Sequence, residues 1–259
     1  MRERIPVVVQ RRRTRRPSAA RALWTAAELA VTLGAVLLLL VVHQLWWTNR
    51  QAQHAARDEV AQLERQWRDT GPPGGAASPG PDDPAVRPGT GRSPSGSGRA
   101  ASHRAAPPAP DRAYAVLRIP RLGVAAPIAE GTGKAAVLNK GYVGHYPHTA
   151  QPGRAGNVGL AGHRNTHGEP FRHLDRLRPG DTVLIDTADA RYTYAVLRTL
   201  PGTTPGDGTV LAALPYSTVH PAYRFTAPAA YLTLTTCTPA YTSTYRLVVW
   251  GVLRSTHRR

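Results

Sequence analysis

The 259-residue chain carries a formal net charge of +17, is 41% hydrophobic and contains one cysteine. A single cysteine excludes an intramolecular disulfide. The basic charge would suit nucleic acid, anionic lipid or anionic cell-wall polymer, but no nucleic-acid motif with interleaved aromatic residues is present, so nucleic-acid binding is not expected. The length allows one smaller domain with appendages, and the uneven composition favours that organisation.

The chain begins with a basic tail, residues 1–21, followed by a mostly apolar segment, residues 22–47. At about 1.5 Å per residue, this segment can cross a hydrocarbon core of roughly 30 Å. Arginines precede it and Trp46 and Trp47 end it, so the tail should be cytoplasmic and the remainder extracellular. A cleaved signal peptide is the alternative, but no small-residue cleavage site ends the apolar run. The sequence therefore predicts a single-pass anchor in the cell membrane.

Two further segments separate this anchor from the rest of the chain. Residues 48–69 are predicted to form a short helical stalk. One apolar stripe runs along it, made of Ala56, Val60, Leu63 and Trp67. Residues 70–111 consist largely of Pro, Gly, Ala and Ser, and offer too little apolar surface to offset the entropy of ordering. They are expected to be a disordered linker that holds a globular unit away from the membrane.

The carboxy-terminal segment, residues 112–259, is long enough for one core. Short runs rich in Val, Ile, Thr or Tyr alternate there with Gly and Pro, which indicates strands. The predicted strands are 113–119, 124–130, 157–162, 182–186, 192–200, 230–237 and 245–253. Short helices are predicted at 134–138, 170–177 and 207–214. Many strands at this spacing are typical of a mainly β barrel or sandwich.

The lone cysteine lies at the end of one predicted strand. Side chains alternate between faces, so Leu232, Leu234 and Thr236 share one face and Cys237 lies on the other, more polar one. The two leucines are expected to face the core. Arg246 begins the next predicted strand, so the thiol and the guanidinium can meet at one rim.

A reactive cysteine needs a histidine or a positive field that favours its thiolate. His163 is the best placed of the histidines by local sequence, because it follows a strand of small residues and precedes a loop. Cys237, His163 and Arg246 are therefore the candidate catalytic residues. Alone, each has an ordinary explanation: a core cysteine, a loop histidine and a solvated arginine.

Three separated motifs together resemble the catalytic signature of sortases. They are TLTTC at 233–237, GLAGHR at 159–164 and Arg246, nine positions after the cysteine. The run GHYPHTAQPGRAGNVGLAGHR, residues 144–164, is also similar to the family's approach to its histidine, and the resemblance extends over nearly all of 112–259. It implies a closed, eight-stranded β-barrel with short helices, and makes 112–259 the catalytic domain.

The resemblance also implies cysteine transpeptidation at a carboxy-terminal sorting signal, cleaved between Thr and Gly. Cys237 would attack the carbonyl and form a thioacyl enzyme, and His163 would protonate the departing amine. Arg246 would position the substrate and stabilise the oxyanion, a task that suits a fixed, always charged donor. Thr236 would help to orient the substrate or Arg246, although a plain strand-forming role explains it equally well.

Within the family, the Thr-Thr-Cys-x-Pro pattern looks most like class E of actinobacteria, whose members accept Leu-Ala-x-Thr-Gly signals. Thr238 stands where class E members often carry His or Asn, so a Leu-Pro-x-Thr-Gly signal stays open. The implied partners are surface proteins with sorting signals and an acceptor amine, from a peptidoglycan precursor or a pilin lysine. The alternatives are a pilin-polymerising sortase and an inactive wall-binding module. An L,D-transpeptidase also uses Cys and His, but its Ser-x-Gly-Cys setting is missing.

No metal or cofactor is expected. His163 and His167 have the spacing of a metal pair on a helix, but glycines around them disfavour a helix, and no third ligand is evident. A calcium site needs clustered carboxylates, and those of this domain are scattered.

Overall fold

The computed structural model describes residues 19–70 and 108–259. The predicted tail, up to residue 18, and the predicted linker, from 71 to 107, lie outside the described residues. The chain divides into two compact units, Met1–Trp47 and Thr48–Arg259. How the whole chain divides into segments stays a prediction.

Helix α1 spans Ala19–Thr70. Its amino-terminal part, up to Trp47, lies in the first unit. Among the described residues, α1 is long and apolar enough to cross a membrane, with a mean hydropathy of 2.3 in its most apolar window. Its large apolar side chains are exposed, Leu29 at 71% and Leu39 at 64%. A helix that exposes this much apolar surface is suited to lipid rather than to water.

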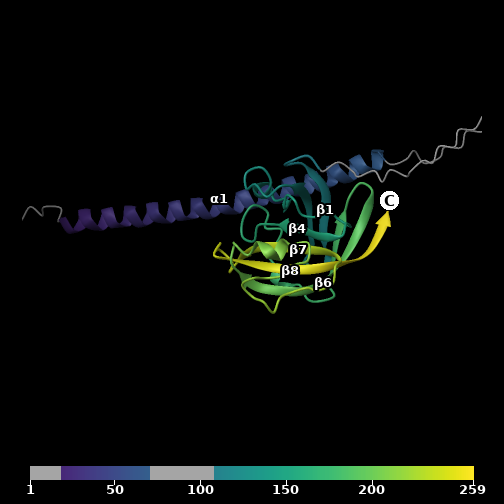
Figure 1. Ribbon diagram of the computed structural model, residues 1–259. Coiled ribbons are helices and arrows are strands. Elements are labelled where there is room, and N and C mark those ends of the chain that lie inside the picture. The colour runs from purple at the N-terminus through teal and green to yellow at the C-terminus, as the bar shows by residue number, and fades with distance from the viewer. Residues whose placement is uncertain (1–18, 71–107) are drawn as a thin grey trace, which may run out of the picture. The chain divides into compact units, whose positions relative to one another are not determined.

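In the second unit, eight strands close into a barrel, in the order β1-β2-β3-β4-β7-β8-β6-β5 (Figure 1). The strands are β1 Ala113–Ile119, β2 Val124–Glu130, β3 Val143–His145, β4 Gly156–Ala161, β5 Thr182–Asp186, β6 Ala190–Thr203, β7 Ala230–Thr238 and β8 Tyr245–Arg258. Neighbours pair in antiparallel fashion except β2 with β3 and β4 with β7, which are parallel. The expected mainly β, closed eight-stranded barrel is confirmed.

The helices of the barrel are single turns. They are η1 Pro120–Leu122, η2 Leu138–Lys140, η3 Leu174–Arg176 and η4 Gly208–Leu211. Each is of the 3-10 type, which rarely extends beyond a turn because its hydrogen-bond geometry is poor. The predicted helices at 134–138, 170–177 and 207–214 are therefore longer than, or displaced from, the turns that form. Strand β3 was not predicted, since three residues give no alternation to detect.

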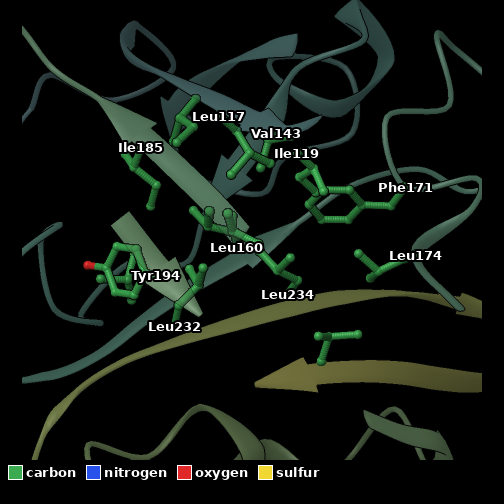
Figure 2. Packing of buried hydrophobic residues seen from close by; sticks show 14 of the residues in the cluster. Leu117, Ile119, Val143, Leu160, Phe171, Leu174, Ile185, Tyr194, Leu232 and Leu234 are labelled. Atoms are coloured by element: carbon green, nitrogen blue, oxygen red, sulfur yellow. The ribbon is translucent and has the colours of Figure 1, made fainter. Parts of the chain in front are cut away.

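The main core fills the barrel interior. Leu232 and Leu234 of β7 are each 1% exposed and belong to this cluster, as their alternation predicted. Figure 2 shows both side chains among those of Leu160, Tyr194 and Phe171, which come from other parts of the barrel. These contacts fix β7 in the barrel wall, and they thereby hold Cys237 near its end in place.

The opposite face of β7 is also buried, which its polar composition did not predict. Thr233 is fully buried and its hydroxyl donates to Asn157 Oδ1 at 2.8 Å. Trp250 of β8 is buried beside it, and its Nε1 donates to the carbonyl of Val210 in η4 at 3.1 Å. The segment between β6 and β7 thus covers this face and satisfies its polar groups.

Asp207 organises that covering segment. Its carboxylate accepts hydrogen bonds from the hydroxyls of Thr203 at 2.7 Å, Thr209 at 2.7 Å and Ser217 at 2.5 Å. Burial alone would raise the pKa of Asp207, but hydrogen bonds from Ser217, Thr203 and Thr209 outweigh it and lower the pKa to about 2. The group is therefore ionised across the physiological range and holds the segment over β7 and β8.

Candidate functional site

The candidate site lies at one rim of the barrel, where β4 and β7 end side by side. The two strands run parallel in unbroken register up to Ala161, which pairs with Thr235. The ladder continues one step, because the Gly162 N–H donates to the Thr235 carbonyl at 3.2 Å. Extending this register by two residues on each strand sets His163 beside Cys237. Parallel neighbours at equal positions project to the same face, so the imidazole and the thiol share one rim.

Cys237 and Arg246 are direct partners in the antiparallel pair of β7 and β8. Residues directly opposite in such a pair have Cβ atoms about 4.5 to 5.5 Å apart and point to the same face. Cys237 is partly exposed, so the residue lies at the surface of the rim. The register therefore sets Cys237 and Arg246 side by side on neighbouring strands, as the sequence analysis expected.

The guanidinium of Arg246 is held by the loop between the two strands. Its Nη1 donates to the carbonyl of Ser243 at 2.8 Å and to that of Tyr245 at 3.0 Å. Tyr241, on this loop, is 78% exposed, and Tyr245, the first residue of β8, is 48% exposed. The arginine is thus anchored through one nitrogen at an open rim, and a guanidinium carries further N–H donors that can meet an anion.

His163 is oriented by an amide. Its Nε2 lies 2.8 Å from Oδ1 of Asn139, in η2. Because Oδ1 only accepts, this contact places a proton on Nε2 and leaves Nδ1 as the atom that exchanges a proton. Burial is the largest cause that lowers the pKa of His163, and electrostatic interactions with His167 and Lys134 lower it further. The rings of His163 and His167 are 5.4 Å apart.

Arg164 ties the histidine loop to the cysteine strand. Its Nη1 donates to the Cys237 carbonyl at 3.4 Å and to the Thr238 hydroxyl at 3.1 Å. Its Nη2 lies 3.4 Å from a carboxylate oxygen of Asp175. The residue next to His163 therefore fixes the backbone of the residue that carries the thiol.

Sequence reasoning gave no role to Asn139 or Arg164. Asn139 is separated from His163 by 24 positions, and no local pattern links the two. Arg164 stands inside the GLAGHR motif, directly after His163. This position next to a candidate catalytic residue was the one sequence feature that could have indicated its role.

Thr236 is 3% exposed, and its hydroxyl donates to the Gly162 carbonyl at 2.7 Å. This bond joins the ends of β7 and β4 and so helps to hold His163 at its place. A direct contact between Thr236 and a substrate stays a prediction.

The rim is distinct from a large cavity elsewhere in the described part of the chain. That cavity, of about 1020 Å³, is lined by Glu64, Trp67, Tyr192 and Arg258, among others, and by none of the candidate residues. Within residues 19–70 and 108–259, no group of three or more His, Cys, Asp or Glu side chains could hold a metal ion.

Comparison with known proteins identifies the family. Residues 117–254 match the family model of the sortase domain. Sortase SrtE1 of Streptomyces coelicolor is 40% identical over 245 residues, which are 92% of this chain and 59% of that protein. Sortase SrtE2 of the same organism is 31% identical over 251 residues, which are 94% of this chain and 87% of that protein. The chain thus spans less than two thirds of the length of SrtE1.

Solved structures agree with these relatives. The crystal structure of sortase E1 from Streptomyces coelicolor with a tripeptide in the active site is 46% identical, with a TM-score of 0.54, over 59% of this chain and 94% of that one. Sortase E from Streptomyces avermitilis is 40% identical, with a TM-score of 0.51, over 58% and 93%. Because the family model covers more than half of the sequence and the barrel has the expected fold, this chain belongs to the sortase family and resembles its class E members.

Proposed function

We propose that the chain is a membrane-anchored cysteine transpeptidase, which cleaves a sorting signal of the Leu-Pro-x-Thr-Gly or Leu-Ala-x-Thr-Gly type between Thr and Gly. It transfers the acyl product to the amine of a cell-wall precursor. One observation carries the proposal: Cys237 and Arg246 are direct strand partners, and His163 follows the parallel strand on the other side of β7, in a chain of the sortase family.

In the first half of the reaction, the thiolate of Cys237 attacks the threonine carbonyl carbon. The carbonyl oxygen becomes an oxyanion, which the Arg246 guanidinium stabilises. The C–N bond to glycine then breaks as protonated His163 gives its Nδ1 proton to the departing amine. A thioester to Cys237 and a free amino-terminal glycine fragment result.

In the second half, the acceptor amine attacks the thioester carbonyl. An amide bond forms, the Cys237 thiolate departs, and the proton of the amine passes to His163, which restores the starting state. Burial, and then electrostatic interactions with His167 and Lys134, lower the pKa of His163 and so disfavour its protonated form. The proton that leaves with the amine is therefore held less tightly than on an ordinary histidine.

Peptide turnover tests this function. The purified full chain in detergent should cleave a fluorogenic Leu-Ala-x-Thr-Gly or Leu-Pro-x-Thr-Gly peptide and, with an added amine, release the amide product detectable by mass spectrometry. Comparing a cell-wall precursor amine with a lysine-containing pilin peptide separates anchoring from pilin polymerisation. No turnover on any sorting peptide would leave an inactive wall-binding module as the better description.

The same proposal places the amino terminus in the cytoplasm and the unit Thr48–Arg259 outside the cell. It is supported by the arginine-rich tail, the apolar helix and Trp46 and Trp47 at its end. Since Cys237 is the only cysteine, a membrane-impermeant thiol reagent should label the wild-type protein in intact cells. A Cys237→Ala/Ser18→Cys variant, with its thiol in the tail, should stay unlabelled until the cells are lysed. The opposite pattern would reverse the assigned orientation.

A further inference from the structure

The carboxy-terminal part of α1, residues 48–70, belongs to the same compact unit as the barrel. One of its faces is covered, and the exposed fractions there are 7% for Ala52, 5% for Ala56, 8% for Val60 and 6% for Leu63. Their spacing of four, four and three residues is that of one helical stripe. A free stalk would leave this stripe in water, so its burial shows a docked helix.

The middle and the end of this segment are fixed to the barrel wall. Val60 and Leu63 pack on Val116 of β1. Glu64 forms an ion pair with Arg118, whose Nε also lies 3.1 Å from Asp186. These contacts combine apolar burial with charge pairing, and so set the position of the helix along the barrel.

Further towards its start, the segment meets the turn that follows η2. A Cβ added to Gly141 would lie 2.8 Å from the Ala52 carbonyl oxygen and 3.4 Å from the Ala56 Cβ, so the backbones are in close contact. Next to this glycine, Tyr142 faces Glu59 of the helix; burial, and then the charge of Glu59, raise the pKa of Tyr142 to about 12. The helix thus rests on the turn that contains Asn139, the partner of His163.

The start of the segment meets the loop of His163 itself. Asn49 Oδ1 accepts a hydrogen bond from the Gly168 N–H at 2.6 Å. A Cβ added to Gly168 would lie 3.1 Å from the Gly141 Cα, so the loop of His163 and the turn of Asn139 touch beneath the helix. The two loops that hold the imidazole therefore share one support.

We propose that residues 48–70 are a positioning element for His163, which clamps the Asn139 turn and the His163 loop together. The inference rests on the proposed role of His163, and no residue of the helix is assigned a contact with the substrate. When the clamp loosens, Asn139 no longer fixes the ring, and water reaches the site. Of the groups around His163, Asn139, His167 and Lys134 lie on the two clamped segments or before them, and Cys237 lies on the neighbouring strand β7. Residues 48–70 then belong to the catalytic unit, because they position one of its reacting groups.

The test uses the full chain and neutral substitutions, so that no new charge acts on the imidazole. Ala56→Gln inserts a polar side chain into the buried face, and Asn49→Ala removes the hydrogen bond to Gly168 while leaving the apolar stripe intact. Ala55→Gln is the matched control, because Ala55 is exposed on the same helix turn. Two quantities are measured: kcat and KM on the sorting peptide, and the pKa of His163 by NMR of histidine-labelled protein, with the resonance assigned through His163→Gln.

We expect kcat to fall roughly tenfold in Ala56→Gln and less in Asn49→Ala, with KM little changed, since the ring is misplaced while Cys237 and Arg246 are untouched. The pKa of His163 should rise towards its ordinary value of about 6.5 in both variants, because the site becomes wetter and Lys134 moves away. Ala55→Gln should match the wild type. A His163 pKa that stays unchanged in both Asn49→Ala and Ala56→Gln overturns the positioning role, even when Ala56→Gln lowers stability. Full turnover by His163→Gln would instead overturn the proposed function, so the two failures are distinguishable.

Discussion

Replacing Cys237 by alanine is expected to abolish turnover of any sorting peptide, by at least about a thousandfold, and to prevent the acyl-enzyme from forming. No other thiol exists in the chain, so nothing can substitute for it as the thioester-forming group. Mass spectrometry of the enzyme incubated with peptide measures this directly, because the acyl product adds its mass to the wild type alone.

The loss should be chemical rather than structural. Cys237 lies at the end of β7 and is partly exposed, so shortening it removes little packing. The thermal unfolding midpoint of Cys237→Ala should therefore stay close to that of the wild type. An adduct of the acyl mass on the alanine variant would move the nucleophile to another residue.

Arg246→Lys should lower kcat/KM about a hundredfold or more, since a single point charge does not reproduce a guanidinium fork at an oxyanion. Nη1 of Arg246 already serves the carbonyls of Ser243 and Tyr245, and the guanidinium presents its other N–H groups in a fixed plane, whereas a lysine would have to serve both carbonyls and the substrate from one nitrogen. Steady-state kinetics on the sorting peptide measure the effect.

The matched control for this variant lies on the same strand. Arg254 of β8 is exposed and lies beyond the pairing of β8 with β7, so Arg254→Lys makes the same chemical change away from the rim. Its kinetics should equal those of the wild type. Near-normal turnover by Arg246→Lys would remove Arg246 from the oxyanion role.

Alternation in the sequence was enough to predict most of the strands, whereas their closure into a barrel was implied by the resemblance to sortases. The bounds of β1, β2 and β5 are the predicted ones, and Leu232 and Leu234 face the core as their period of two required. The second buried face of β7 was not predictable in this way. Thr233 looks solvent-facing by composition, and only the distant segment held by Asp207 covers it. Local periodicity does not report what a loop far along the chain will cover.

The candidate site also contains residues that the sequence could predict and residues that it could not. Cys237, His163 and Arg246 stand in motifs, and strand ends were enough to suggest that they meet. The groups that orient them come from elsewhere in the chain: Asn139 approaches His163 from η2, and Asn49 supports its loop from α1. The stripe of residues 56 to 67 predicted a helix correctly, but a stripe does not name the surface on which it packs.

The pairing of β7 with β8 sets the backbone spacing at the rim independently of the length of the loop that joins the two strands. Their register runs without a shift from Tyr231 opposite Val252 to Thr238 opposite Tyr245, and it includes the pair of Cys237 and Arg246. Because this ladder and the buried faces behind it set the backbone spacing of Cys237 and Arg246, residues 239–242 do not have to, whereas Ser243 holds the guanidinium. Insertions, deletions or grafted sequences at 239–242 can therefore reshape what approaches the thiol while the backbones of the reacting residues keep their separation.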